Sequence, residues 1–314
     1  MPKLTVVETP TAPAAIEALA DEFLADCRAR GLAVRTVEWY RDTLRREFLP
    51  FCAREKVTDP AQLTAALVGR YTARLIDEGG GRGPLSRATV RGYVRAVRVF
   101  LGWAEKEGGA TVGASPKLPK AESRVMDVLT RDEIQRMENA AKTERDKLIL
   151  RIMADAGIRL GELLALRVED LLEPKRGEYA LKVRGKGSRE RLVPIRPVLY
   201  QRLKRYLNGR SAVGQEPVFV ALRKGTDGKY SPITKSGVEQ AIRLLGREAG
   251  IERRVYPHLL RHSFAIEWLR RGANIISLQR VLGHTDLSMI QGVYSHLSTS
   301  DDYAAMLSVL APKE

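Results

Sequence analysis

Apolar residues in the first third of the chain recur every three or four positions, which predicts helices. The clearest case is residues 86–109, "SRATVRGYVRAVRVFLGWAEKEGG", where Ser86 is suited to cap the helix and the glycine pair at 108–109 to end it. Its apolar stripe consists of Val90, Tyr93, Val94, Val97, Phe100 and Leu101. A second helix is expected within "RTVEWYRDTLRREFLPFC", residues 35–52. We therefore predict a helical first domain over residues 14–108.

The pattern is interrupted between the two halves of the chain. Residues 108–124, "GGATVGASPKLPKAESR", are rich in Gly, Pro and Lys and read as a linker. Beyond it, Thr130 and Glu133 form a capping-box pattern that begins a new helix. The predicted boundaries are a linker over 109–126 and a second domain over 127–314.

The second domain changes period partway along. It begins with helical spacing, but the segment "EYALKVRGKGSRERLVPI", residues 178–195, contains two short strand-like runs on either side of Gly185–Ser188. This is the pattern of a β-hairpin. Helical spacing returns after "SPIT", residues 231–234. The predicted fold class is mainly α with a small antiparallel β-sheet.

Composition adds a strong charge preference to this picture. The chain has 314 residues and a formal net charge of +15. Such an excess on a folded protein favours a polyanionic partner, usually nucleic acid, and leaves RNA binding open. Four arginines without an intervening acid line one face of the 86–109 helix, which favours a phosphate-binding face: Arg87, Arg91, Arg95 and Arg98. Arg41 and Arg45 repeat the pattern, diluted by Asp42 and Glu47.

Other features narrow the class of protein. No apolar run is long enough to cross a bilayer, and the N-terminal segment lacks the apolar core of a secretory signal. We therefore expect a cytoplasmic protein without a membrane partner. Cys27 and Cys52 are expected to be reduced and partly buried. With about a dozen residues before the first predicted helix, we expect no further N-terminal domain.

Four places in the second domain hold groups suited to phosphate chemistry. Arg159 follows Gly157, and Glu162 lies three residues further on, where it can orient the guanidinium. Lys186 lies at the predicted hairpin tip, and "YPHLLRHSF" spaces one histidine and one arginine for a shared helix face. Finally, "LGHTDLSMIQGVYSH", residues 282–296, contains a histidine in a turn and a tyrosine ten residues later. The residues in question are His258, Arg261, His284 and Tyr294.

The histidines do not suggest a metal site. His258 and His262 are four residues apart, but Leu259 occupies the position where a zinc protease needs a glutamate. No third ligand is evident, so no metal or other cofactor is expected. His262 and His296 are interpreted as structural.

In combination, these motifs resemble the tyrosine recombinase, or phage integrase, family. The segments "AGIRLGEL", "GKGSRERLVPI", "HLLRHSFA" and "LGHTDLSMIQGVYSH" stand in the family's order, and every catalytic position of the family is matched. The resemblance spans residues 14–300 and is closest to the simple two-domain recombinases of the Xer type. It implies a helical core-binding domain and a mixed α/β catalytic domain that form a C-shaped clamp on DNA.

The resemblance also implies a role for each matched residue. Arg159 and Arg261 would hold the nonbridging oxygens of the scissile phosphate, and Lys186 would protonate the departing 5′ oxygen. His258 would accept the tyrosine proton, and His284 would bind the phosphate. Tyr294 would attack and form a 3′-phosphotyrosyl link, without metal or ATP.

Three functions are compatible with these motifs. The first is a site-specific DNA recombinase or integrase, the second a type IB topoisomerase with related chemistry, and the third a noncatalytic DNA-binding regulator. The helical N-terminal domain and the C-terminal segment favour the first over the second, and the complete set of catalytic residues argues against the third. The family further implies a homotetramer on two DNA duplexes, with one or two copies on a single site. The apolar spacing of Tyr303, Met306, Leu307 and Leu310 predicts a terminal helix, either docked on its own domain or donated to a neighbouring protomer.

Overall fold

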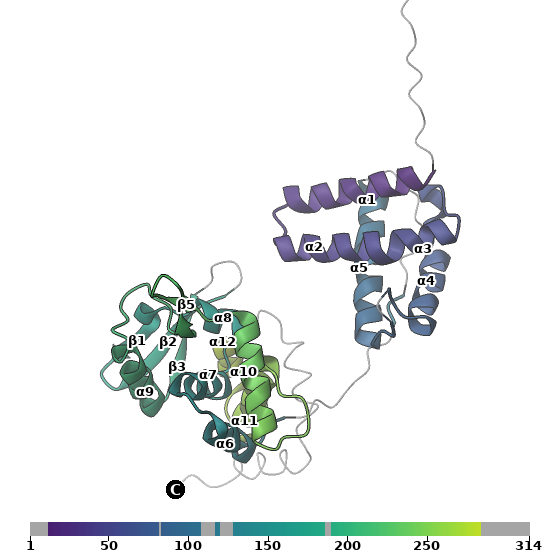
Figure 1. Cartoon of the computed structure of the whole chain (residues 1–314). Helices are drawn as coiled ribbons and strands as arrows, with labels where there is room; N and C mark the ends of the chain where they lie inside the picture. The colour runs from purple at the N-terminus through teal and green to yellow at the C-terminus, as the bar shows by residue number, and fades with distance from the viewer. Residues whose placement is uncertain (1–11, 82, 108–116, 120–127, 186–189, 284–314) are drawn as a thin grey trace, which may run out of the picture. The chain divides into compact units, whose positions relative to one another are not determined.

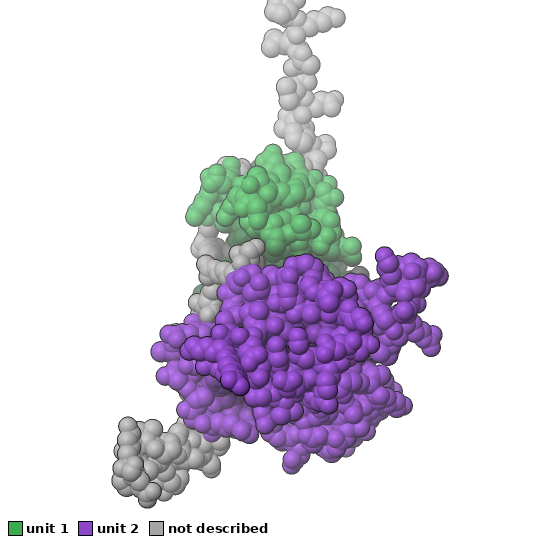
Figure 2. Space-filling model, turned by 90° about the vertical axis from the view of Figure 1, so that its left-hand side faces the viewer, with its two compact units in different colours: residues 1–124 green, residues 125–314 purple. Residues whose placement is uncertain are grey.

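The protein is described here from a computed structural model covering residues 12–81, 83–107, 117–119, 128–185 and 190–283. The chain divides into two compact units, Met1–Arg124 and Val125–Glu314, which Figure 2 colours separately. The described parts of both units are mostly helical, with small antiparallel sheets in the second unit only. The predicted fold class is confirmed.

Unit 1 is built from helices around one apolar core. Its α-helices are α1 (Ala12–Ala29), α2 (Val34–Thr43), α3 (Leu49–Arg54), α4 (Ala65–Asp77) and α5 (Arg87–Lys106). Short helical turns connect them at Leu44–Phe48 and Pro60–Gln62. Helices α1 and α2 run side by side and α5 crosses them (Figure 1). The rings of Phe23 and Phe48 pack edge-on against Phe100 of α5, with centroids 5.6 and 6.4 Å away.

Helix α5 has the N-terminal cap and the buried apolar stripe that its sequence predicts. Ser86 accepts a hydrogen bond from the Thr89 backbone N–H and caps the first turn. The apolar stripe faces the core: Val90, Val94, Val97, Phe100 and Leu101 are buried, while Tyr93 is half-buried. Both cysteines, Cys27 and Cys52, are free and buried in this unit.

Unit 2 is built around helix α7, which other helices of the unit cover. Its helices are α6 (Arg131–Ala140), α7 (Glu144–Asp155), α8 (Leu160–Ala165), a short turn at Val168–Asp170, α9 (Pro197–Asn208), α10 (Lys235–Glu248), α11 (Pro257–Arg270) and α12 (Ile275–Leu282). Helix α7 contacts α6, α8, α9, α10 and α11. The predicted capping box of Thr130 and Glu133 is present at the start of α6. Figure 1 shows the sheet and α9 at one side of this unit and α10 at the other.

Two antiparallel sheets complete unit 2. The first has the order β1–β2–β3, from Leu171–Lys175, Glu178–Arg184 and Glu190–Ile195. Strands β2 and β3 pair from Tyr179–Ile195 to Arg184–Glu190, so the predicted hairpin is confirmed. The second sheet pairs β4 (Val220–Lys224) with β5 (Tyr230–Pro232); the pattern of residues did not predict it, nor strand β1.

Candidate active site

A sharp turn between α7 and α8 presents Arg159. Gly157 adopts a φ of +61°, and a Cβ there would lie 2.2 Å from the Phe264 ring. Only glycine fits this combination of left-handed backbone and close approach. Arg159 then occupies the N-cap of α8, and its side chain remains 42% exposed. The catalytic residue proposed from the sequence is therefore held by a rigid turn and still open to a ligand.

Glu162 is the buried carboxylate beside Arg159. Its Oε1 accepts from Arg159 Nη1 at 2.8 Å, and its Oε2 from the Arg159 backbone N–H at 2.7 Å. Arg191 on β3 adds two more bonds, Nη1 to Oε1 and Nη2 to Oε2, both 2.8 Å. Burial by itself would raise the pKa of Glu162, but the bonds from Arg191 and Arg159 outweigh it and hold the pKa below its ordinary value. The carboxylate is therefore ionised and accepts four hydrogen bonds.

Arg261, on α11, is only 4% exposed. It donates from Nη1 to the Gly157 carbonyl and from Nη2 to the Leu282 carbonyl, the latter at 2.7 Å. Burial lowers the pKa of its guanidinium to about 9, and the positive charge of Arg159 acts in the same direction. At neutral pH the guanidinium is still protonated, so two cations lie close together.

His258 lies one turn before Arg261 on α11. It is on the exposed side of the helix start. Partial burial lowers the pKa of its imidazole, and the charges of Arg261 and Arg159 lower it further. A neutral imidazole has one free acceptor nitrogen, which is what proton acceptance requires.

These side chains line one open pocket of about 790 Å³. Arg159, His258 and Arg261 contribute to its wall, and Gln240 and Arg243 of α10 contribute from another side. Within the stretches that the structure describes, no three metal-ligating side chains lie close enough together to hold a metal ion. The chemistry that this pocket offers is binding of a phosphate ester by fixed cations, with a neutral base next to them.

The predicted catalytic residues Lys186, His284 and Tyr294 lie outside the described residues, as does His296, which was interpreted as structural. Lys186 belongs to the connection between β2 and β3, and His284 directly follows Gly283 at the end of α12. The structure therefore brings together Arg159, Glu162, His258 and Arg261. Of the two histidines interpreted as structural, His262 is half-buried on α11.

Arg191 was missed by reasoning from the sequence. It lies 29 residues from Glu162, and nothing local distinguishes it from other charged residues in "GSRERLVPI". The signal that could have identified it is the two-residue period of β3. Val193 and Ile195 are buried, and Arg191 lies on the same face of the strand.

In unit 1, the predicted DNA-binding arginines differ in exposure and in the groups that they contact. Arg95 is exposed and Arg98 half-exposed on α5, and neither forms an ion pair with another described residue. Arg91 instead donates to the Pro119 carbonyl, while Arg87 lies at the exposed start of the helix. Arg41 and Arg45 are exposed and ion-paired, with Asp42 at 3.2 Å and Asp21 at 2.5 Å.

Comparison with solved structures identifies the class of fold. The structure of XerH site-specific recombinase in a post-cleavage complex with palindromic difH substrate matches with a TM-score of 0.68 and 21% identity, covering 92% of this chain and 84% of that one. A lambda integrase tetramer bound to a Holliday junction matches with a TM-score of 0.66 and 18% identity, covering 90% and 80%. The fold is that of the tyrosine recombinases.

Sequence comparison then identifies the family. Residues 127–301 match the phage integrase family. Tyrosine recombinase XerA of Saccharolobus solfataricus is 33% identical over 275 residues, 85% of this chain and 84% of that protein. Tyrosine recombinase XerD of Bifidobacterium longum is 31% identical over 283 residues, 86% of this chain and 89% of that protein. The chain belongs to the phage integrase family and is similar over most of its length to Xer tyrosine recombinases.

Separately, none of the helices in the described ranges has the length and apolar character to span a membrane.

Proposed function

We propose that this protein is a site-specific DNA recombinase that cuts and rejoins strands through Tyr294. The observation that supports this most is the shared pocket of Arg159, His258 and Arg261, with Glu162 fixing Arg159. In a chain of this family the ligand of that pocket is the scissile phosphate. The two guanidinium groups bind its nonbridging oxygens, because their planar forks match phosphate and remain charged at neutral pH.

The reaction then follows from the charges in the pocket. Tyr294 Oη attacks the phosphorus as its proton passes to the neutral imidazole of His258. The bond from phosphorus to the 5′ oxygen breaks, and that oxygen leaves as a hydroxyl with a proton from Lys186. His284 and the two arginines stabilise the pentacoordinate transition state. The product is a 3′-phosphotyrosyl link, a phosphodiester that keeps the free energy needed to rejoin the strand. We therefore propose that ATP is not required, and that the protein cations make a metal unnecessary.

The partners and organisation belong to the same proposal. Residues 14–108 form the core-type DNA-binding domain, residues 109–126 the linker, and residues 127–314 the catalytic domain, which together clamp double-stranded DNA. Arg95 and Arg98, with Arg87 and Arg91, bind phosphates from α5. One or two copies occupy a single site and four assemble on two duplexes, in the cytoplasm.

Two plasmids test the proposal against a type IB topoisomerase. Sites are first selected by the protein from a random-sequence duplex library. A supercoiled plasmid with two such sites should yield deletion or inversion products, whereas a plasmid without a site should keep its supercoils. Relaxation of both plasmids without exchange would identify a topoisomerase. If neither recombination nor relaxation occurs, the protein is a noncatalytic DNA-binding regulator.

A further inference from the structure

The carboxyl end of α12 is held by three arginines from three different elements. Arg191 Nε donates to the Val281 carbonyl at 2.7 Å, Arg261 Nη2 to the Leu282 carbonyl at 2.7 Å, and Arg159 Nη2 to the Gly283 carbonyl at 3.2 Å. These consecutive carbonyls have no partner within the helix, and cations are favoured at this end. The end of α12 thus orients both arginines of the pocket.

Arg191 differs from the other two because it is not among the side chains that line the pocket. All three of its nitrogens are engaged, one with Val281 and two with Glu162, and its side chain is only 14% exposed. It therefore connects the carboxylate that fixes Arg159 to the helix end that fixes Arg261. Gly283 closes this arrangement with a φ of +64°, and a Cβ there would lie 2.9 Å from Arg191 Nη1.

We propose that Arg191 is a positioning residue of the cleavage site, which acts through Glu162 and the end of α12 on Arg159 and Arg261. The inference rests on the proposed function. Without Arg191, the buried carboxylate of Glu162 would retain Arg159 as its one charged partner. The guanidinium of Arg159 would then be drawn toward Glu162 and away from the phosphate, and the Val281 carbonyl would lose its donor.

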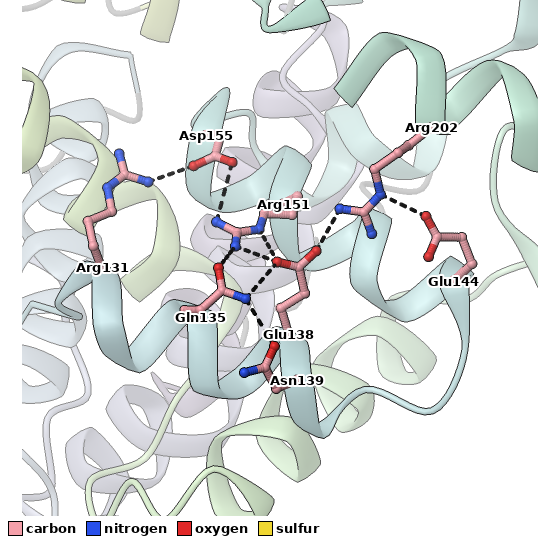
Figure 3. Close-up of polar contacts among 8 residues, drawn as sticks. All are labelled: Arg131, Gln135, Glu138, Asn139, Glu144, Arg151, Asp155 and Arg202. Atoms are coloured by element: carbon pink, nitrogen blue, oxygen red, sulfur yellow. Dashed lines mark hydrogen bonds and ion pairs between the residues drawn. The ribbon is translucent and has the colours of Figure 1, made fainter. Parts of the chain in front are cut away.

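The same unit contains a matched control, shown in Figure 3. Glu138 also accepts from two arginines, Arg151 Nε and Arg202 Nη1, each at 2.6 Å. Arg202 is comparably buried, with 20% of its side chain exposed, and donates in addition to Glu144 at 2.8 Å. This cluster involves α6, α7 and α9 and does not include the arginines of the pocket (Figure 3). Replacing Arg202 therefore removes a similar ion pair without touching the site.

The experiment compares Arg191→Met, Arg191→Lys and Arg202→Met. Each full-length variant is assayed for melting temperature, for affinity toward a duplex bearing the selected site, and for the single-turnover cleavage rate of a nicked form of that duplex at saturating protein. Arg191→Met should bind within about threefold of the wild type but cleave roughly 10- to 100-fold more slowly, since small displacements of catalytic groups have effects of that size. Arg191→Lys should fall between, because lysine keeps the charge but not the forked geometry. Arg202→Met should cleave at the wild-type rate.

The outcomes separate the two proposals. A wild-type rate in Arg191→Met overturns the positioning role, as does an equal loss of rate in Arg202→Met at an equal drop in melting temperature. If Arg191→Met does not fold, the comparison of Arg191→Lys with Arg202→Met decides, and a wild-type rate in Arg191→Lys then contradicts the role. Absence of cleavage by the wild type would instead refute the proposed function itself.

Discussion

At the residue scale, the site is organised by one buried carboxylate. The negative charge of Glu162 reduces the repulsion among the neighbouring arginines. The carboxylate accepts four hydrogen bonds, from the backbone and side chain of Arg159 and from the side chain of Arg191. The spacing of Arg159 and Glu162 in the sequence was sufficient to predict their contact. The contact with Arg191 could not be predicted, because it depends on the pairing of β3 with β2 and on where α8 packs.

The pKa of His258 is a measurable property of the pocket. Partial burial and the charges of Arg261 and Arg159 lower its pKa, so its imidazole should titrate by NMR below the ordinary value of about 6.5. In Arg159→Met the midpoint should rise part of the way, because burial is the largest cause and remains. Arg202→Met should leave the midpoint unchanged.

The sign for stability follows from the same shift. The unfolded chain binds this proton more tightly than the folded protein does, so the contribution of His258 to stability is present above the ordinary pKa and is lost as pH falls from there through the lowered pKa of the folded protein. A titration midpoint at or above the ordinary value in the wild type would contradict the electrostatic account of the pocket.

At the element scale, the hydrophobic spacing of α5 predicted which of its faces is buried. The cap of α5 was confirmed, and the predicted stripe packs on the core with five residues buried and Tyr93 half-buried, because helix packing in a small core follows the sequence pattern closely. The phosphate-binding role of the arginine row on the same helix stays a prediction, and one of its members, Arg91, also donates to the Pro119 carbonyl in the chain beyond the helix. That contact is long-range, and helical periodicity contains no information about it.

The salt dependence of DNA binding tests which arginines of unit 1 contact phosphate. Arg95→Ala or Arg98→Ala should reduce the slope of log Kd against log salt concentration by about one, because each removes one phosphate contact. Arg45→Ala should reduce it less, since Asp21 already binds this guanidinium at 2.5 Å. Unchanged slopes in Arg95→Ala and Arg98→Ala would show that this face of α5 is merely solvated.

At the scale of the whole molecule, the chain has two separately packed units, one with an aromatic helical core and one around α7. The stretch rich in Gly, Pro and Lys, residues 108–124, ends where the two units divide, and its role as a linker stays a prediction. The pocket belongs wholly to unit 2. In the proposed account the chemistry therefore needs unit 2, while affinity for a site draws on both units.

Assembly depends on the terminal segment in the proposed account. Removal of residues 301–314 should abolish cooperative synapsis of two duplexes and leave binding to a single site within about threefold, because a donated helix adds contacts between copies and none to DNA. Gel shifts with one and two labelled sites measure both properties. Recombination at the wild-type level by the truncated chain would exclude donation and favour a terminal helix docked on its own domain.

Formation of a covalent DNA adduct tests the central claim most directly. The wild-type protein is incubated with a nicked duplex bearing its selected site, and the denatured products are separated and digested for mass spectrometry. We expect an adduct in which Tyr294 carries the 3′ phosphate and the other strand end is a free 5′ hydroxyl. Tyr294→Phe should bind the same duplex with unchanged affinity and form no adduct. An adduct on another residue, or one that persists in Tyr294→Phe, would contradict the account.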